Sequence, residues 1–164
     1  MAARRIVSNT GPLISLEKLR HGYDFIRQLY DTIIIPPGVL PEVAEGQFAT
    51  PHAYVQRYGI VDLIEVHAIS RSEQLPEAAR LHSGEAQAIQ LARELTLPLL
   101  IEETAGRRVA RGLGISISGI AGQILKAFRQ GSLTAQEARN KLLELLQAGR
   151  INRKIYEALL AAIP

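Results

Sequence analysis

Residues 83–111 constrain the fold most strongly, because they predict a helix, a buried strand and a second helix in direct succession. Apolar residues recur at helical spacing over 83–96, so one side of this helix should face a core. Pro98 ends the helix, and residues 99–101 form a short apolar run of the kind that is buried in a parallel sheet. This unit predicts a fold in which strands and helices alternate along the chain.

The same alternation of short apolar runs with helical patterns extends over most of the chain. It predicts a three-layer α/β/α fold with a mostly parallel sheet of roughly five strands. We expect an α/β domain over residues 1–130 and a C-terminal helical hairpin over 131–164 that packs on the same domain. The expected strands cover residues 5–7, 32–35, 60–69, 99–101 and 115–118, and the expected helices cover 10–19, 25–30, 38–45, 83–96, 104–110, 119–128, 134–147 and 152–161.

Three segments carry weaker or more local signals. Residues 60–69 alternate in polarity, which indicates an edge strand with one solvated face. Residues 47–59 are expected to form a loop or a short helix, and residues 70–82 a loop with a helical piece around 76–80. Side chains suited to capping helix starts are Ser83, Thr104, and Thr134 together with Glu137, the last two as a capping box.

Composition excludes several classes of protein and site. With 164 residues, of which 47% are hydrophobic, the chain is long enough for one domain with its own core. It contains no cysteine, which excludes disulfides, thiolate nucleophiles and zinc–thiolate sites. No apolar run approaches the ~20 residues of a membrane span, and the first apolar run is too short for a signal peptide, so we expect a cytoplasmic protein with no membrane partner. A net charge of +3 and a pI near 9.4 mildly favour an anionic partner.

Acidic residues stand where a ligand site would form in such a fold. Glu102 and Glu103 directly follow the apolar run at 99–101, at the carboxyl end of a predicted strand. In open α/β sheets, ligands bind at this edge. Glu85 lies in the first turn of the preceding helix, so this unit can place Glu85 and Glu102 in one crevice.

Two further polar residues occupy comparable positions earlier in the chain. Asn9 follows the first predicted strand, and Glu42 lies early in the helix that opens near Gly38. Ordinary roles remain open for all of these residues: Asn9 as a helix cap, Glu42 and Glu85 as first-turn acids favoured by the helix dipole, and Glu103 as a solvated neighbour of Glu102.

Together with the sequence around them, these residues resemble the active-site pattern of the PIN-domain nucleases. The resemblance is closest to a bacterial and archaeal branch of predicted nucleic-acid-binding proteins, in which a helical tail after the α/β part is also usual. It covers roughly residues 5–130, on four segments in the expected order: IVSNTGPLISL at 6–16, IIIPPGVLPEV at 33–43, HSGEAQAIQLA at 82–92 and LLIEETAGRRVARGLGISISGIAG at 99–122.

The resemblance implies a metal-dependent ribonuclease. In such enzymes, converging carboxylates bind a hard divalent cation, here Mg²⁺ or Mn²⁺, which generates or orients a hydroxide for attack on a phosphodiester. The implied substrate is RNA, with DNA as an alternative, and one role in the family is the toxin of a toxin–antitoxin pair, with an antitoxin protein as partner. The implied ligand positions are Asn9, Glu42, Glu85 and Glu102, with Glu103 as an alternative to Glu102, and the implied catalytic residues are Glu42, Glu85 and Glu102.

The chain departs from the family pattern in ways that affect catalysis. Asn9 stands where Asp is more common and carries no charge, while Glu102 stands where Asp is usual and is one methylene longer. A metal displaced by about an ångström is enough to cost ~10²-fold in rate. A second hypothesis is therefore a catalytically decayed PIN-fold module that binds nucleic acid or protein. A third is a structural α/β module whose acidic residues are all helix caps, which predicts that these residues lie far apart.

A basic cluster and the C-terminal helices suggest partners. Arg107, Arg108 and Arg111 follow the acidic pair on one short helix and can contact a nucleic-acid backbone, or else form a solvated face that pairs with Glu102 or Glu103. The four histidines show no metal-ligand spacing, so we expect them at the surface or in turns. Members of the family commonly form homodimers, and the apolar residues available for such an interface are Leu142, Leu143, Leu145, Leu146, Ile155, Leu159 and Leu160.

Overall fold

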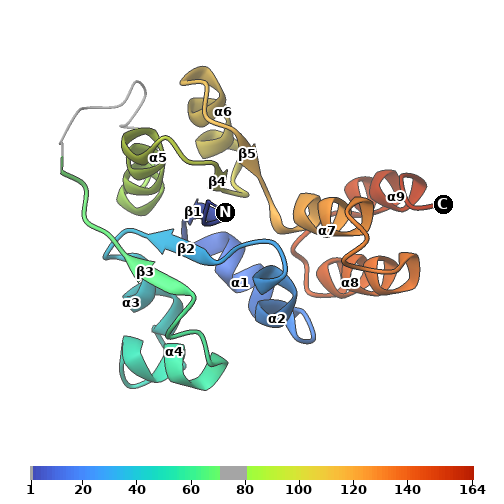
Figure 1. Cartoon of the computed structure of the whole chain (residues 1–164), viewed down its shortest axis with the longest axis horizontal. Helices are drawn as coiled ribbons and strands as arrows, with labels where there is room; N and C mark the ends of the chain where they lie inside the picture. Colours follow the sequence, from blue (N-terminus) through green and yellow to red (C-terminus); the bar gives the residue numbers. More distant parts are fainter. Residues whose placement is uncertain (1, 71–80) are drawn as a thin grey trace.

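The computed structural model describes residues 2–70 and 81–164, and it contains a five-stranded parallel sheet flanked by helices (Figure 1). All four pairings between neighbouring strands are parallel. The predicted α/β architecture is therefore confirmed, and the sheet is wholly rather than mostly parallel. The strands are β1 (Arg5–Ser8), β2 (Thr32–Ile35), β3 (Ile64–Val66), β4 (Leu99–Leu100) and β5 (Ile117–Ser118).

The sheet has the strand order β3-β2-β1-β4-β5, with β1 at its centre. The chain moves outward from β1 to β3 on one side and then returns to place β4 on the other side of β1. Ile6 lies opposite Ile33 of β2, and Val7 lies opposite Leu99 of β4. Successive strands are added on one side of β1 up to β3 and on the other side from β4 onward. The point between β1 and β4 where this order reverses is the kind of switch point at which α/β sheets bind ligands.

Helices cover both faces of the sheet. In Figure 1, α5 and α6 lie across the sheet from α1–α4, and α7–α9 are gathered beside one end of it. The strands alternate accordingly, because Ile33 and Ile35 belong to the core beneath α1–α4 while Ile34 belongs to the core beneath α5 and α6. The helices are α1 (Thr10–Lys18), α2 (Gly22–Arg27), α3 (Val39–Ala44), α4 (Pro51–Tyr58), α5 (Ser83–Leu95), α6 (Thr104–Gly112), α7 (Ile120–Arg129), α8 (Ala135–Gln147) and α9 (Arg153–Ala161).

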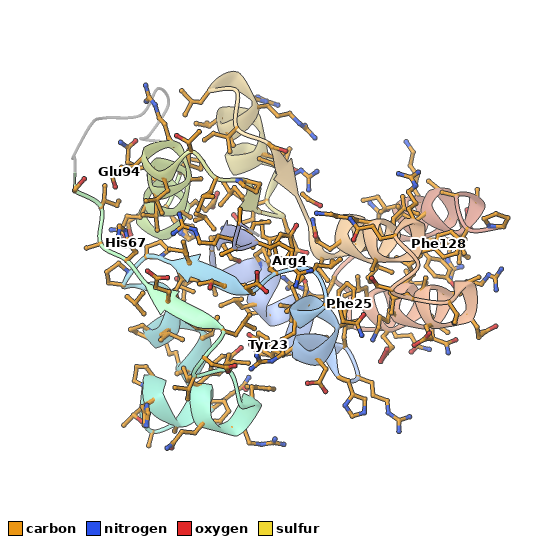
Figure 2. All side chains as sticks on the ribbon, in the orientation of Figure 1. Arg4, Tyr23, Phe25, His67, Glu94 and Phe128 are labelled. Carbon is orange, nitrogen blue, oxygen red and sulfur yellow. The ribbon has the colours of Figure 1, made fainter. Side chains whose placement is uncertain are left out.

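The C-terminal helices share the larger of the two cores. Leu142 and Leu145 of α8 are fully buried in the cluster that also contains residues of α1 and α2. Phe25 of α2 lies on the side of α8 (Figure 2), where Nζ of Lys141 is 5.4 Å from the centre of its ring. Leu142 and Leu145 therefore face this core, and their expected place in an interface between copies is wrong. Leu143 and Ile155, at 39% and 45% exposure, do reach the surface.

Helix starts follow the predicted cap chemistry in the C-terminal part of the chain. Thr134 and Glu137 form the predicted capping box at the start of α8. At the starts of α5 and α6, the predicted capping residues Ser83 and Thr104 do not occupy the N-cap position. His82 and Glu103, whose backbones are extended, are the N-caps, and Ser83 and Thr104 are the first helical residues.

Three strands are shorter than their sequence patterns. Within residues 60–69 only Ile64–Val66 pair with β2, in the predicted edge position, and within 115–118 only Ile117–Ser118 pair with β4. The strand expected at 99–101 comprises Leu99–Leu100. The segment at 47–59 contains α4, whose start is capped by Thr50. The helical piece predicted around 76–80 lies outside the described residues.

None of the helices in the described part of the chain is long enough to cross a membrane. The longest, α5 and α8, contain 13 residues each, whereas a membrane-spanning helix needs about 20 apolar residues.

Candidate functional site

The topology brings several helix starts to one edge of the sheet. Each strand is followed by a helix (α1, α3, α5, α6 and α7 in turn). The helices α1, α3, α6 and α7 begin within four residues of the end of the preceding strand, whereas a longer connection leads from β3 to α5. Because all five strands are parallel, these helix starts share the carboxyl edge. Residues at these starts are Asn9 before α1, Glu42 in the first turn of α3, Glu85 in the first turn of α5, and Glu103 before α6, with Glu102 immediately preceding it.

Three of these side chains form one group together with His82, and we name it the Glu85 cluster: His82, Glu85, Glu103 and Glu42. One ligand atom from each of His82, Glu85 and Glu103 lies within 4.8 Å of the others. Nε2 of His82 is 3.7 Å from Oε1 of Glu85. Glu42 borders the group, since a Cβ on Gly84 would lie 3.5 Å from its Oε2. The structure thus brings Glu42, Glu85 and Glu103 together.

Glu85 is the buried member of this cluster, with 3% exposure. Burial raises the pKa of Glu85 to about 7, assisted by a hydrogen bond shared with Glu103 and by the charges of Glu103 and Glu42. Its Oε2 has no hydrogen-bond partner among the described residues. A buried carboxylate oxygen without a partner is unusual and calls for an ion or a proton.

Asn9 and Glu102 belong to a second group, which we name the Glu102 cluster: Asn9, Glu102, Ser15 and Arg150. A Cβ on Gly11 would lie 3.7 Å from Oε1 of Glu102 and 3.9 Å from Oδ1 of Asn9. Glu102 accepts hydrogen bonds from the Ser15 hydroxyl at 2.7 Å and from Nη2 of Arg150 at 3.2 Å. The two clusters meet at the peptide bond between Glu102 and Glu103.

The side chain of Asn9 does not act as a helix cap. Asn9 has the N-cap position of α1 but makes no side-chain capping bond, and its buried Oδ1 has no hydrogen-bond partner within the described ranges. Glu103 likewise occupies an N-cap position without capping α6 through its side chain. The grouping of these residues does not match a set of unrelated caps scattered over the surface.

The donors of the Glu85 cluster fit a divalent cation. They comprise carboxylate oxygens and one imidazole nitrogen, and Oε2 of Glu85 has no hydrogen-bond partner among the described residues. Mg²⁺ takes carboxylate oxygens, and Mn²⁺ accepts imidazole as well. The assignment of particular ligands remains a prediction.

Two residues at this edge were not among the predicted site residues. His82 is exposed at the surface, as expected, but it also lies three residues before Glu85, a spacing that places both on one side of the helix start. Arg150 lies in the turn between α8 and α9, 48 residues from Glu102. No local pattern in the sequence indicates that contact.

The three arginines of α6 differ in their surroundings. Nη1 of Arg107 donates to the carbonyl of Ile101 at 3.3 Å. Burial and then the charge of Arg111 lower the pKa of Arg107, while the charge of Glu102 opposes the shift. Arg108 and Arg111 are exposed. In the part of the chain that the structure describes, none of the three forms an ion pair with Glu102 or Glu103 within 4.0 Å, so that predicted pairing is not observed.

Comparison with known proteins shows the family to which this fold belongs. A family model for the PIN domain matches residues 5–163. Among solved structures, the chain is similar to a PilT N-terminus domain protein from the hyperthermophilic archaeon Sulfolobus solfataricus P2, with a TM-score of 0.52 and 17% identity over 73% of this chain and 88% of that one. No curated protein matches the chain. Since the family match spans nearly the whole sequence, including the C-terminal helices, the chain belongs to the PIN-domain family.

Proposed function

We propose that this chain is a metal-dependent nuclease that hydrolyses RNA phosphodiesters, with Mg²⁺ or Mn²⁺ held by the Glu85 cluster. The observation that carries the proposal is the buried Glu85 carboxylate, which has an unpartnered oxygen and stands within 4.8 Å of ligand atoms from His82 and Glu103. The family match supports a nuclease-type module.

The charges of the cluster explain why a cation would bind there. Each close pair of carboxylates repels by about 4 kcal/mol at an effective dielectric constant of 20. Without a cation, burial and the neighbouring carboxylates raise the pKa of Glu85 to about 7. A proton bound to Glu85 then removes part of the negative charge of the cluster near pH 7. A bound divalent cation supplies the positive charge that stabilises all three carboxylates and lowers the pKa of a bound water.

The protein side chains would divide the remaining work. Glu85 and Glu103 would hold the cation with His82. Glu42 is exposed at the rim of the cluster and would accept a proton from the attacking water. Arg108 and Arg111, exposed on the helix that starts at Glu103, would contact phosphates of the RNA, and Arg107 would line the edge beside Glu102.

The proposed function includes a more specific biological role, an oligomeric state and a substrate. A toxin of a toxin–antitoxin pair, acting in the cytoplasm and held by an antitoxin protein, is the narrower form of the ribonuclease function. A homodimer would use the exposed Leu143 and Ile155 on the C-terminal helices. RNA is the proposed substrate. Parallel cleavage assays with RNA and with DNA of the same sequence decide which of these two nucleic acids is cleaved.

The second candidate function is binding without cleavage. It is favoured by the neutral Asn9 and by Glu102, whose charge is already paired with Arg150. It predicts nucleic-acid binding that is unaffected by metal and by Glu85→Gln.

Cleavage of a labelled RNA by the purified chain separates the two candidates. The nuclease proposal predicts cleavage with Mn²⁺ or Mg²⁺, none with EDTA, and a loss of at least about 100-fold in Glu85→Gln. Glu65→Gln, an exposed substitution on β3, serves as the matched control and should cleave normally. Equal cleavage by wild type and Glu85→Gln would indicate a contaminating nuclease and remove the proposal.

A further inference from the structure

We propose that Arg150 is the resident cation of the Glu102 cluster, so that Glu102 positions this arginine and the divalent cation binds in the Glu85 cluster alone. The metal part of this inference rests on the proposed function, whereas the pairing of Arg150 with Glu102 does not. Glu102 is then a positioning residue for Arg150, and Glu103 rather than Glu102 is the metal ligand.

Both carboxylate oxygens of Glu102 accept hydrogen bonds from groups of the protein. Oε1 accepts from the Ser15 hydroxyl at 2.7 Å and from Nη2 of Arg150 at 3.2 Å, which uses both of its lone pairs. Oε2 accepts from the backbone N–H of Ile120, the first residue of α7, at 3.2 Å. Protein donors therefore occupy both oxygens of this carboxylate, in contrast to the orphaned Oε2 of Glu85.

The guanidinium of Arg150 is fixed by several hydrogen bonds. Its guanidinium donates through Nε to the Ser15 hydroxyl at 2.9 Å and through Nη2 to the carbonyl of Gly11 at 3.0 Å, in addition to Glu102. The guanidinium is thus held by three groups on α1 and at the end of β4. Arginine remains charged at any pH at which the protein is folded, so this positive charge is permanent.

The burial of the pair distinguishes it from a surface ion pair. The side chains of Arg150 and Glu102 are 27% and 18% exposed, whereas those of the pair Arg153–Glu157 on α9 are 73% and 65% exposed. Exposed pairs contribute little to stability, but removing one partner of a largely buried pair leaves an uncompensated charge. Arg150 therefore also ties the turn between α8 and α9 to the carboxyl edge of the sheet.

The start of α7 packs closely against one side of Glu102. A Cβ on Gly119 would lie 3.3 Å from Cγ of Glu102, whereas a Cβ on Gly11 would make an ordinary contact 3.8 Å from Nη2 of Arg150. A divalent cation on Oε1 would have to displace the guanidinium and would be repelled by it. The permanent charge of Arg150 thus directs the metal to the other cluster.

Titration of the metal-free protein with Mn²⁺, followed by calorimetry, tests the metal part. We expect a single Mn²⁺ per chain, an affinity loss of at least about tenfold in Glu103→Gln, and a change of less than about threefold in Glu102→Gln. Arg150→Gln should free Glu102 and tighten Mn²⁺ binding or add a second site. A loss in Glu102→Gln as large as that in Glu103→Gln, or an Arg150→Gln variant that binds Mn²⁺ as the wild type does, would overturn this part.

A double-mutant cycle in EDTA tests the pairing without metal. Arg150→Gln and Glu102→Gln should each lower the melting temperature by at least about 5 °C, and the double variant should lose clearly less than the sum. The same cycle with Arg153→Gln and Glu157→Gln, the exposed pair, should show additive and small effects. Additive losses at Arg150 and Glu102 would overturn the pairing.

The outcomes separate this inference from the proposed function. A chain that binds Mn²⁺ and cleaves RNA but needs Glu102 for the metal overturns the inference and leaves the nuclease proposal intact. A chain that binds no Mn²⁺ overturns the nuclease proposal and the metal part together, while the cycle still decides whether Arg150 holds Glu102.

Discussion

His82 and Glu85 lie one helical turn apart at the start of α5, with Nε2 of the imidazole 3.7 Å from Oε1 of the buried carboxylate. This relationship adds a nitrogen donor to a group of carboxylate oxygens. Mg²⁺ strongly prefers oxygen ligands, whereas first-row transition metals also accept imidazole. We therefore expect the choice of metal to depend on His82.

Replacing His82 by alanine should weaken Mn²⁺ binding more than Mg²⁺ binding. We expect a loss of about tenfold for Mn²⁺ and less than about threefold for Mg²⁺, because only Mn²⁺ uses the nitrogen donor effectively. Calorimetric titration with each metal measures both values. His52→Ala, an exposed substitution in the first turn of α4, is the control and should change neither. Equal losses for the two metals would show that His82 acts by some route other than ligation.

The metal-free protein should lose stability as the pH rises from about 4.5 to about 7. The pKa of Glu85 is raised from its ordinary value of 4.5 to about 7 by burial, by the hydrogen bond with Glu103 and by the charges of Glu103 and Glu42. Between these values the folded state holds a proton that the unfolded state has lost, so the free energy of unfolding falls with increasing pH. His82 is the basic group that faces Glu85 within this cluster.

Thermal unfolding in EDTA between pH 5 and pH 8 measures this effect. The wild type should melt at a lower temperature at pH 8 than at pH 5, and Glu85→Gln should remove most of the difference because the amide does not titrate. Mn²⁺ should restore stability at pH 8 by binding the folded state. A melting temperature of Glu85→Gln that falls as steeply as that of the wild type would assign the pH dependence to other groups.

Gly106→Ala should be destabilising because this position on α6 packs closely against Glu85. An added Cβ would lie 2.5 Å from Cδ1 of Ile101 and 2.9 Å from Oε2 of Glu85. Overpacking of this kind costs about 1–3 kcal/mol in the free energy of unfolding. Gly112→Ala, in the same helix, is the matched control, because no described atom other than those of its own helix and chain neighbours lies within 4 Å of its added Cβ. Chemical denaturation of both variants measures the difference, and equal stabilities would contradict the close packing around Glu85.

Arg108→Gln and Arg111→Gln should weaken RNA binding through the loss of phosphate contacts. Each substitution is expected to reduce the slope of log K against log[salt] by about 1. Fluorescence anisotropy with the Glu85→Gln background measures binding without cleavage. Arg57→Gln, on the opposite side of the molecule in α4, should leave the slope unchanged. An unchanged slope in the α6 variants would place the nucleic acid elsewhere.

Much of the fold was accessible from local patterns. The β-branched run at Thr32–Ile35 predicts β2 with the observed bounds, and Thr134 with Glu137 predicts the start of α8. Edge strands were harder, because the pairing of Ile117–Ser118 depends on how far β4 extends beside them. The length of an edge strand is set by its neighbour, and a single sequence does not contain that information.

Some features of the candidate site could likewise be expected from the sequence, and others could not. Acidic residues in first helical turns, such as Glu85, could be expected at one edge once a parallel sheet was inferred. The contribution of His82 depends on the direction of its side chain, and that of Arg150 on a contact across 48 residues. Local sequence patterns therefore did not indicate Arg150 as the partner of Glu102.

An anomalous-scattering map from crystals soaked in Mn²⁺ tests the central claim most directly. We expect a single peak enclosed by His82, Glu85 and Glu103, with Arg150 still bonded to Glu102. A peak on Glu102 with Arg150 displaced, or no peak at millimolar Mn²⁺, would contradict it.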